Sequence, residues 1–315
     1  MITTSATDRN MLARGGFMIL TLVILLAGGY WAEGRAVPHH RRRGEGVTRL
    51  HNVTLNNATL GPAMATGGEL VLQGYRIDRF GKDMFDLLAR TASLTLRKGS
   101  IPNVFFASDT LDSFQIDSTG LESFDLNPFP SPNLRILQIT RNSLELISPR
   151  ISYLTGLRTL DLSQNRLTYV ELNLFEPMRH LRDLDLSVNR IVRIEAVGKT
   201  GQPLTVRNLW VSYNRLVAFD EFPEAFPSLA TMRLHGNDWS CPWVDWARGE
   251  IMRKGITVFG ADYDCSGDRR GGLCCYDNLK STTENGQPVD VPTLIIENEP
   301  NGTIGVKFGE VEIFY

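Results

Sequence analysis

The chain has 315 residues, of which 42% are apolar, and this is enough to bury a substantial core. Its formal net charge of −2 and its isoelectric point near 6.2 exclude a whole-chain argument for nucleic acid or an anionic membrane as the partner. Any binding surface must therefore be argued from local patterns.

Residues 1–34 have the composition of a secretory signal peptide. Two arginines precede the apolar run FMILTLVILLA, and small residues that suit a cleavage site follow it. Residues 15–32 are also long enough for a tilted membrane span, and the basic run at 41–43 is unusual directly after a cleaved signal. A retained signal anchor is therefore the alternative, and residues 35–68 are interpreted as a linker and N-terminal cap.

A leucine-rich motif, LxxLxLxxNxL, dominates the middle of the chain. Its first strand leucine, or the residue that replaces it, recurs every 20 to 25 residues at Leu70, Leu94, Phe114, Leu137, Leu160, Leu184, Leu209 and Met232. This period is typical of leucine-rich repeats, in which each coil consists of a short strand and a loosely helical return. The pattern predicts eight repeats over residues 69–236.

The motif residues have separate structural roles. In each LxL strand the leucines should point inward and stack on those of the next coil, with about 2 kcal/mol of burial for each leucine. The asparagines from Asn142 to Asn237 should form a ladder, because a carboxamide both donates to and accepts from buried backbone groups. On the return side, Phe175, Phe222 and Phe226 are predicted to pack between coils.

The predicted fold class is α/β, a leucine-rich-repeat solenoid (horseshoe) with short parallel strands on its concave face and a disulfide-stapled C-terminal cap. The ends of such a stack must be covered, because no coil buries its own apolar faces. Residues 47–60 are expected to add an irregular capping strand at the N-terminal end. Residues 237–276, with Trp239, Trp243 and Trp246, form the predicted C-terminal cap, and residues 277–315 form a tail with an expected hairpin at Asn301-Gly302.

The cap contains all four cysteines of the chain, Cys241, Cys265, Cys274 and Cys275. A bond between adjacent cysteines is strained, so Cys241 and Cys265 are each expected to pair with one of the other two. A zinc site is the alternative, but the spacing lacks CxxC, and we expect structural disulfides, no metal and no cofactor. The cysteines and the glycosylation acceptors Asn52, Asn57 and Asn301 favour an extracellular location.

Strand alternation defines the outward side chains on the concave face. The middle column comprises Val71, Thr95, Gln115, Gln138, Asp161, Asp185, Trp210 and Arg233, and its outer neighbour ends with Ser163, Ser187, Ser212 and His235. The face therefore becomes more polar toward the C-terminal half.

The predicted ligand-binding residues lie in that half. Asp161 and Asp185 should be about 5 Å apart on adjacent strands, and Asp183 adds a third carboxylate, so the site should favour a cation. Trp210 and Tyr213 supply aromatic area, and Arg233 and His235 complete the predicted surface. The alternative is that the aspartates are structural and that the arginines at 158, 182 and 207 neutralise them.

No catalytic set is apparent in the sequence. HExxH, GxSxG and phosphate-binding glycine loops are absent from the sequence, and its five histidines are scattered. The basic run at 39–43 is interpreted as a solvated linker rather than an anion site. We therefore do not expect an enzyme, and we expect no nucleic acid partner.

Two cysteine motifs carry a family resemblance, GNDWSC at 236–241 and GLCCYD at 272–277. A leucine-rich stack that ends in these motifs resembles the mosquito leucine-rich-repeat immune proteins, over about residues 60 to 280. The resemblance implies a secreted haemolymph protein of innate immunity without enzymatic activity. It also implies a protein partner, such as a complement-like thioester-containing protein, or a microbial surface.

The chain departs from those family members after the cap. Residues 276–315 show no heptad pattern and no spare cysteine, so we expect a coil-less member without an interchain disulfide. The function predicted is a secreted recognition or scaffold protein that binds through its concave face. A membrane-tethered adhesion protein or receptor ectodomain is the alternative, and it requires an uncleaved signal.

Overall fold

The computed structural model describes residues 47–52, 68–196, 202–277, 295–298, 304–308 and 311–314. The expected signal, most of the linker, and the acceptors Asn57 and Asn301 lie outside these residues. Within these ranges, no helix combines the length and apolar character that a membrane crossing requires.

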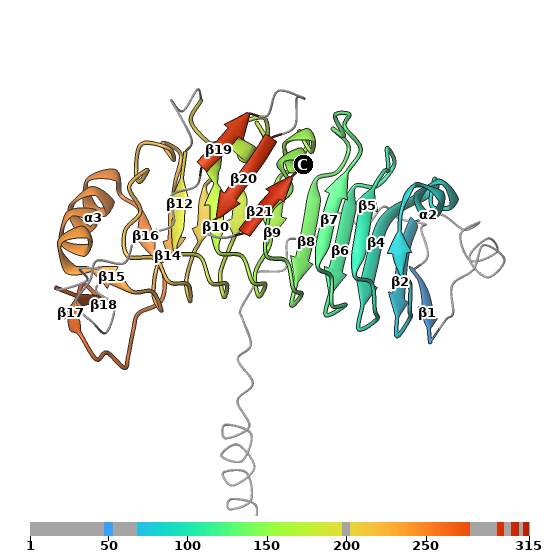
Figure 1. Ribbon diagram of the computed structural model, residues 1–315. Coiled ribbons are helices and arrows are strands. Elements are labelled where there is room, and N and C mark those ends of the chain that lie inside the picture. The colour runs from blue at the N-terminus through green and yellow to red at the C-terminus, as the bar shows by residue number, and fades with distance from the viewer. Residues whose placement is uncertain are drawn as a thin grey trace, which may run out of the picture. The chain divides into compact units, whose positions relative to one another are not determined.

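A ten-stranded parallel sheet runs the length of the solenoid, and its strands lie in chain order (Figure 1). Each strand belongs to one coil, and the chain returns between strands on the other side of the stack. The strands are β1 (Val47–His51), β2 (Gly68–Gln73), β4 (Thr91–Arg97), β6 (Ser113–Asp117), β8 (Ile136–Thr140), β9 (Thr159–Asp161), β11 (Asp183–Asp185), β13 (Asn208–Trp210), β14 (Thr231–Arg233) and β16 (Thr257–Val258). The predicted leucine-rich-repeat solenoid is confirmed.

The marker residues of the motif form the inner spine of the stack. From Leu70 to Met232, each pairs with its counterpart on the next strand. Each marker side chain is no more than 3% exposed, so they are buried together as predicted. At the N-terminal end, β1 pairs with β2, and Leu50 lies opposite Leu72. This strand extends the sheet beyond the first repeat, as expected of a cap.

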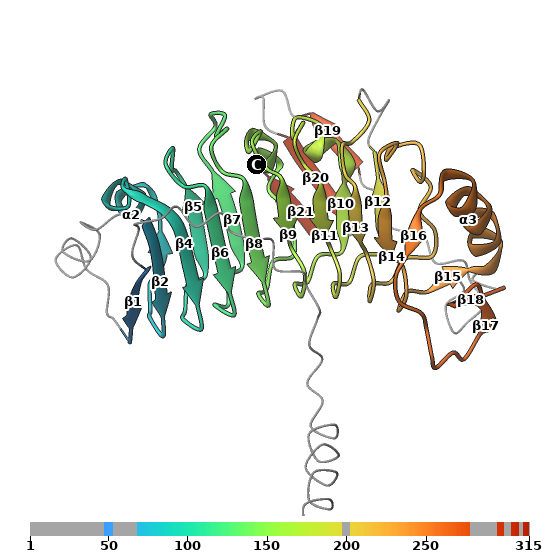
Figure 2. The same ribbon diagram turned by 180° about the vertical axis from the view of Figure 1, so that it is seen from behind.

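The return side combines short strands with helical turns (Figure 2). In the early coils, β3 (Arg79–Phe80), β5 (Asn103–Phe106) and β7 (Ser123–Leu126) form a second parallel sheet beside helix α2 (Lys82–Leu87). Later coils contain the 3₁₀ helices η2 (Pro149–Tyr153) and η3 (Leu172–Phe175) and the strand pair β10 (Tyr169–Glu171) and β12 (Arg193–Glu195). The predicted wedges Phe175, Phe222 and Phe226 are buried between coils.

The asparagine ladder has the predicted hydrogen bonds. The Asn165 amide donates to the carbonyls of Ile139 (2.7 Å) and Leu162 (3.0 Å), and its oxygen accepts from the Leu144 N–H (3.2 Å). Asn189, Asn214 and Asn237 repeat these contacts, and Asn142 shares two of them. Each carboxamide therefore joins two successive coils.

Helix α3 (Cys241–Lys254) covers the C-terminal end of the stack. It begins at Ser240, whose hydroxyl accepts a hydrogen bond from the Trp243 N–H, and it ends at the left-handed Gly255. The ring of Trp239 stacks on that of Trp243, with centroids 4.1 Å apart, and both side chains are buried. The expected role of the third tryptophan is corrected in part, because Trp246 is 46% exposed and meets the stack edge-on at the ring of Phe222, with centroids 6.2 Å apart.

The short strands of the cap are β15 (Trp239–Ser240), β17 (Asp268–Arg270) and β18 (Leu273–Tyr276). One disulfide joins α3 to β18, and a second joins the loop before β17 to β18. Cys241 is bonded to Cys275, and Cys265 is bonded to Cys274. Each of the adjacent cysteines thus takes a separate partner, as the sequence indicated. All four sulfurs are in disulfides, which contradicts the zinc alternative.

The tail contains β19 (Ile295–Asn298), β20 (Ile304–Phe308) and β21 (Val311–Phe314). These strands form a three-stranded antiparallel sheet in which β20 is central. The predicted turn at Asn301-Gly302 falls between β19 and β20 and lies outside the described residues.

Candidate binding surface

The outward side chains of the middle column lie in one row across the sheet. Asp161 pairs with Asp185, Asp185 with Trp210, and Trp210 with Arg233 on the adjacent strands β9, β11, β13 and β14 (Figure 2). Their neighbours along each strand are buried leucines, Val211 or Met232, so these side chains occupy the opposite face, here called the open face. The structure therefore brings four of the predicted ligand-binding residues together.

Asp161 and Asp185 form a like-charge pair on the open face. The Asp161 carboxylate accepts a hydrogen bond from the Ser163 N–H (3.0 Å), and Asp185 accepts from the N–H (2.9 Å) and hydroxyl (2.5 Å) of Ser187. Burial and the neighbouring Asp161 carboxylate raise the pKa of Asp185 to about 6, although the Ser187 hydrogen bonds oppose the shift. Burial also raises the pKa of Asp161. The pair is therefore costly to ionise fully in the folded chain.

The third aspartate lies in a different row and has its own partners. Asp183 pairs with Thr159 and Asn208, and its oxygens accept hydrogen bonds from the Thr159 hydroxyl (3.2 Å) and the Asn208 amide (2.5 Å). The Thr231 hydroxyl donates in turn to the Asn208 carbonyl oxygen. This chain of hydrogen bonds crosses four strands and gives Asp183 a structural role. The cation site suggested by three carboxylates therefore reduces to the pair Asp161 and Asp185.

The arginines expected to neutralise the aspartates lie elsewhere. Arg158, Arg182 and Arg207 directly precede their strands and are exposed. In the described ranges, the ion pairs within 4.0 Å include none of these arginines and none of the three aspartates. The like-charge pair is thus not compensated by direct contact with these arginines.

Aromatic side chains continue the open face beyond the aspartates. Trp210 is half-buried, whereas Tyr213 is 48% exposed and packs edge-on against the His235 ring, with centroids 4.9 Å apart. Gly236 makes room for Tyr213, because a Cβ there would lie 2.5 Å from its ring. A Cβ at Gly260 would likewise lie 2.5 Å from the ring of His235. The two glycines therefore let neighbouring coils place their rings side by side.

His235 is half-buried, with Asp262 and Arg233 nearby. Burial lowers the pKa of His235, and the nearby Arg233 lowers it further, while Asp262 opposes the shift. Its Nδ1 is buried without a hydrogen-bond partner among the described residues. Arg233 contributes positive charge at this end of the surface.

Two exposed apolar residues beside these side chains were not identified from the sequence. Phe259 follows β16 and falls beside Arg233, since the preceding Val258 pairs with Met232, and it is 49% exposed. It lies outside the repeat motif, so no periodic signal identified it. Val188 occupies the coil next to Tyr213 and is 45% exposed, with a positive φ of 55°. The corresponding position is polar in the preceding coils, so the apolar Val188 could have been recognised from the sequence as an exception.

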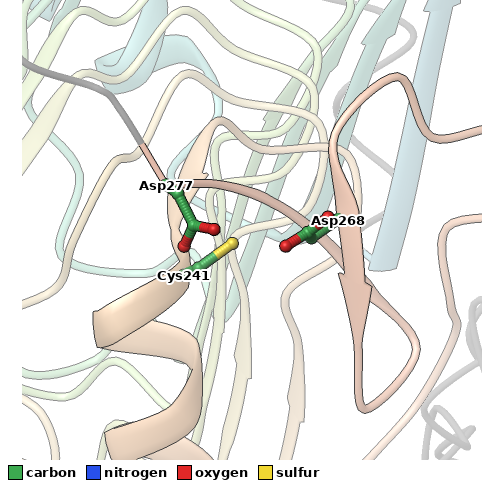
Figure 3. A group of neighbouring side chains, drawn as sticks. All are labelled: Cys241, Asp268 and Asp277. Atoms are coloured by element: carbon green, nitrogen blue, oxygen red, sulfur yellow. The ribbon is translucent and has the colours of Figure 1, made fainter.

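One cluster in the cap has the arrangement of metal ligands. The side chains of Cys241, Asp268 and Asp277 converge in the described part of the chain (Figure 3). The Cys241 sulfur is bonded to Cys275 and cannot act as a thiolate ligand. Arg270 contacts both aspartates at 3.2 Å. This group is therefore an ion-pair cluster that joins the cap strands.

Comparisons with known proteins agree with this fold. A family model described as leucine rich repeat matches residues 132–191. A crystal structure of the mosquito LRIM1/APL1C complex has 20% identity and a TM-score of 0.53, with 74% of this chain and 51% of that chain covered. The leucine-rich repeat domain of APL1B has 20% identity and a TM-score of 0.50, with 73% and 71% covered. This likeness shows the fold.

The first of these matches extends well beyond the shared part, since this chain spans about half the length of that relative. No curated protein sequence matches the chain.

Proposed function

We propose that this chain is an extracellular leucine-rich-repeat recognition protein of insect innate immunity, without enzymatic activity. In this proposal it binds a protein partner through the recognition surface, defined as Asp161, Asp185, Val188, Trp210, Tyr213, Arg233, His235 and Phe259. The disulfides support an extracellular location. The solved complex of the similar proteins LRIM1 and APL1C supports a protein partner.

The observation that carries the proposal is the row Asp161, Asp185, Trp210 and Arg233. Two carboxylates face each other at a cost to the folded chain, since burial and mutual repulsion raise the pKa of Asp185. A half-buried tryptophan and an arginine lie beside them on adjacent strands. Aromatic and arginine side chains dominate binding energies at protein interfaces. A partner that inserts a lysine or arginine between the carboxylates would relieve their repulsion.

The complement-like thioester-containing protein and a microbial surface are the partners that the family resemblance suggests. Affinity capture from immune-challenged haemolymph with the purified chain, followed by mass spectrometry, identifies the partner. Size-exclusion chromatography with and without haemolymph proteins then tests for a stable complex. The absence of any co-eluting protein under immune challenge would contradict the proposal.

The substitution Trp210→Ala tests the surface directly. We expect it to weaken binding of the captured partner by at least tenfold, because truncation of an interface tryptophan commonly costs about 2 kcal/mol or more. The melting temperature should change little, since the Trp210 side chain is on the open face. Gln115→Ala, at the same position of an N-terminal coil, is the matched control and should bind normally. If Trp210→Ala and the control bind the partner equally well, Trp210 is not part of the recognition surface.

The uncharged run at residues 15–32 favours a second candidate, a membrane-tethered adhesion protein or receptor ectodomain. The binding surface is the same in both candidates. Sequencing the N-terminus of the exported product separates them, because a cleaved signal removes the run and an anchor retains it.

A further inference from the structure

Four consecutive coils carry an arginine directly before the sheet strand. These residues, here called the arginine track, are Arg135, Arg158, Arg182 and Arg207, and all four are exposed. The same position is Asp112 in the preceding coil and Ala230 in the following coil, so the track has two defined ends. It lies along the edge of the sheet where the strands begin, beside the recognition surface and distinct from it.

The backbone fixes the spacing of the track. The Arg135 carbonyl accepts hydrogen bonds from the N–H groups of Arg158 (2.8 Å) and Thr159 (3.1 Å). The carbonyls of Arg158 and Arg182 hold the next coil in the same way. The arginines therefore follow the strand spacing of about 4.8 Å, and the four span about 14 Å. Since the backbone makes these contacts, the guanidinium groups are not needed for them.

The charges of the track are largely uncompensated. Arg135 contacts Asp112 at 3.2 Å, but this pair is more than half exposed and therefore weak. Arg158, Arg182 and Arg207 have no ion pair among the described residues. Asp183 directly follows Arg182, and its oxygens accept hydrogen bonds from Thr159 and Asn208.

We propose that the arginine track binds a sulfated linear polysaccharide laid along the sheet edge. Guanidinium groups bind sulfate and carboxylate through paired hydrogen bonds, and a row of them about 5 Å apart is relieved of repulsion by a polyanion along the row. The charges form a line rather than a plane, which fits a polymer chain better than a membrane surface. The disulfides indicate an oxidising compartment, where sulfated polysaccharides occur and free nucleic acid is scarce.

The test compares two triple variants of the full chain on heparin. The first is Arg158→Gln with Arg182→Gln and Arg207→Gln, which removes three charges of the track. The matched control is Arg166→Gln with Arg190→Gln and Arg215→Gln. These arginines are exposed, lie in the same three coils, follow the asparagine ladder at the other end of the strands and also lack ion pairs in the described part. Both variants lose the same charge, and thermal melting verifies that both are folded.

We expect the wild-type chain to bind heparin at about 0.15 M NaCl. The track variant should bind about tenfold more weakly, and the slope of log Kd against log salt should fall by about two to three. The control should bind within about twofold of wild type. Equal weakening of both variants overturns the proposal, as does a wild-type chain that does not bind.

Three further measurements exclude other sources of binding. A variant with glutamine at positions 41–43 tests the basic run before the first strand. The proposal fails if this variant loses all heparin binding while the track variant retains it. Desulfated heparin should bind weakly, because the proposed ligand group is sulfate. Duplex DNA that binds the track as tightly as heparin at the same salt concentration would contradict the choice of polymer.

Discussion

The coils built on β2, β4 and β6 differ from those built on β9, β11 and β13 in how the chain leaves its strand. The early strands have six, seven and five residues, whereas the later strands have three each. The early coils place Tyr75, Gly99 and Thr119 in the slot that asparagine fills later. Gly99 is required there, because a Cβ would lie 2.5 Å from the Tyr75 ring.

The early coils satisfy their backbone through direct contacts between coils. The Ser100 N–H donates to the Tyr75 carbonyl (2.8 Å), and the Ile101 N–H donates to the Thr119 carbonyl (3.0 Å). In the later coils, side-chain amides make the equivalent contacts, as at Asn165 and Asn189. Both solutions leave few buried polar groups without partners, so the spine stays the same while the strand length changes.

The two regions also differ in their interiors and on the open face. Phenylalanines fill the early coils, where the Phe85 ring packs edge-on against the rings of Phe80, Phe106 and Phe114. On the open face, the middle column there is neutral, whereas the later coils carry the charged and aromatic recognition surface. Open-face side chains make few contacts with the spine, and their identity can therefore vary without changing the fold. This difference supports placing the binding surface in the later coils.

The largest expected effect is that of removing one step of the asparagine ladder. Asn165→Ala should lower the free energy of unfolding by about 3 kcal/mol, because several buried backbone groups lose their partners together. Thr119→Ala is the matched change in an early coil and should cost about 1 kcal/mol, since the strand ladder is intact there. Chemical denaturation measures both variants. Equal costs would mean that the two regions do not differ in this respect.

A smaller effect follows from the like-charge pair. The pKa of Asp185, raised to about 6, lies above the ordinary value of 3.8, so the folded chain binds this proton more tightly than the unfolded chain. Its contribution to the free energy of unfolding therefore falls as the pH rises from about 4 to about 6. Asp185→Asn should remove this dependence and raise the free energy of unfolding at pH 7 by about 2 kcal/mol.

Denaturation of wild type and variant at several pH values measures this gain, which should vanish near pH 4. Asp183→Asn is the control and should give no gain, because two side chains already donate to that carboxylate. If Asp185→Asn is no more stable than wild type at pH 7, the pair carries no cost and loses its functional significance.

The smallest effect concerns the left-handed residue that precedes the asparagine slot. A β-branched side chain is strained at a φ of 55°, so Val188→Gly should raise the free energy of unfolding by about 0.5 to 1 kcal/mol. Lys98→Gly, at the same position of an early coil, should gain less, because lysine is unbranched. Thermal melting of both variants measures the difference. A destabilised Val188→Gly would show that Val188 has a packing role.

Much of the fold could be predicted from the sequence, because the spacing of the repeat specifies which residues point inward in every coil. The inward positions, the ladder from Asn142 to Asn237 and the buried Phe175 all follow from a period of 20 to 25 residues. The second sheet of β3, β5 and β7 could not, since its short strands are stabilised by pairing with neighbouring coils rather than by local propensity. The exposure of Trp246 could not be predicted from the sequence either, because the helix face that contacts the stack depends on how α3 packs against it.

The candidate surface was predicted in part. Strand alternation placed Asp161, Asp185, Trp210 and Arg233 in one row, and the register confirms that row. It also suggested that Asp183 adds to the same site, whereas hydrogen bonds across four strands hold that carboxylate in another row. Hydrogen bonds between strands depend on rotamers, which periodicity does not specify.

The solenoid, the inward leucines and the role of asparagine could be predicted from the sequence, because each repeats from coil to coil. The sequence also predicted that Cys274 and Cys275 take separate partners, but the structure was needed to show that Cys241 pairs with Cys275. The folded structure was also needed to show which charges find partners. Arg158, Arg182 and Arg207 are close to the aspartates along the chain, yet they lie at the start of the strands while the Asp161 and Asp185 pair is on the open face. Distance in space, and not separation in sequence, sets the strength of an ion pair.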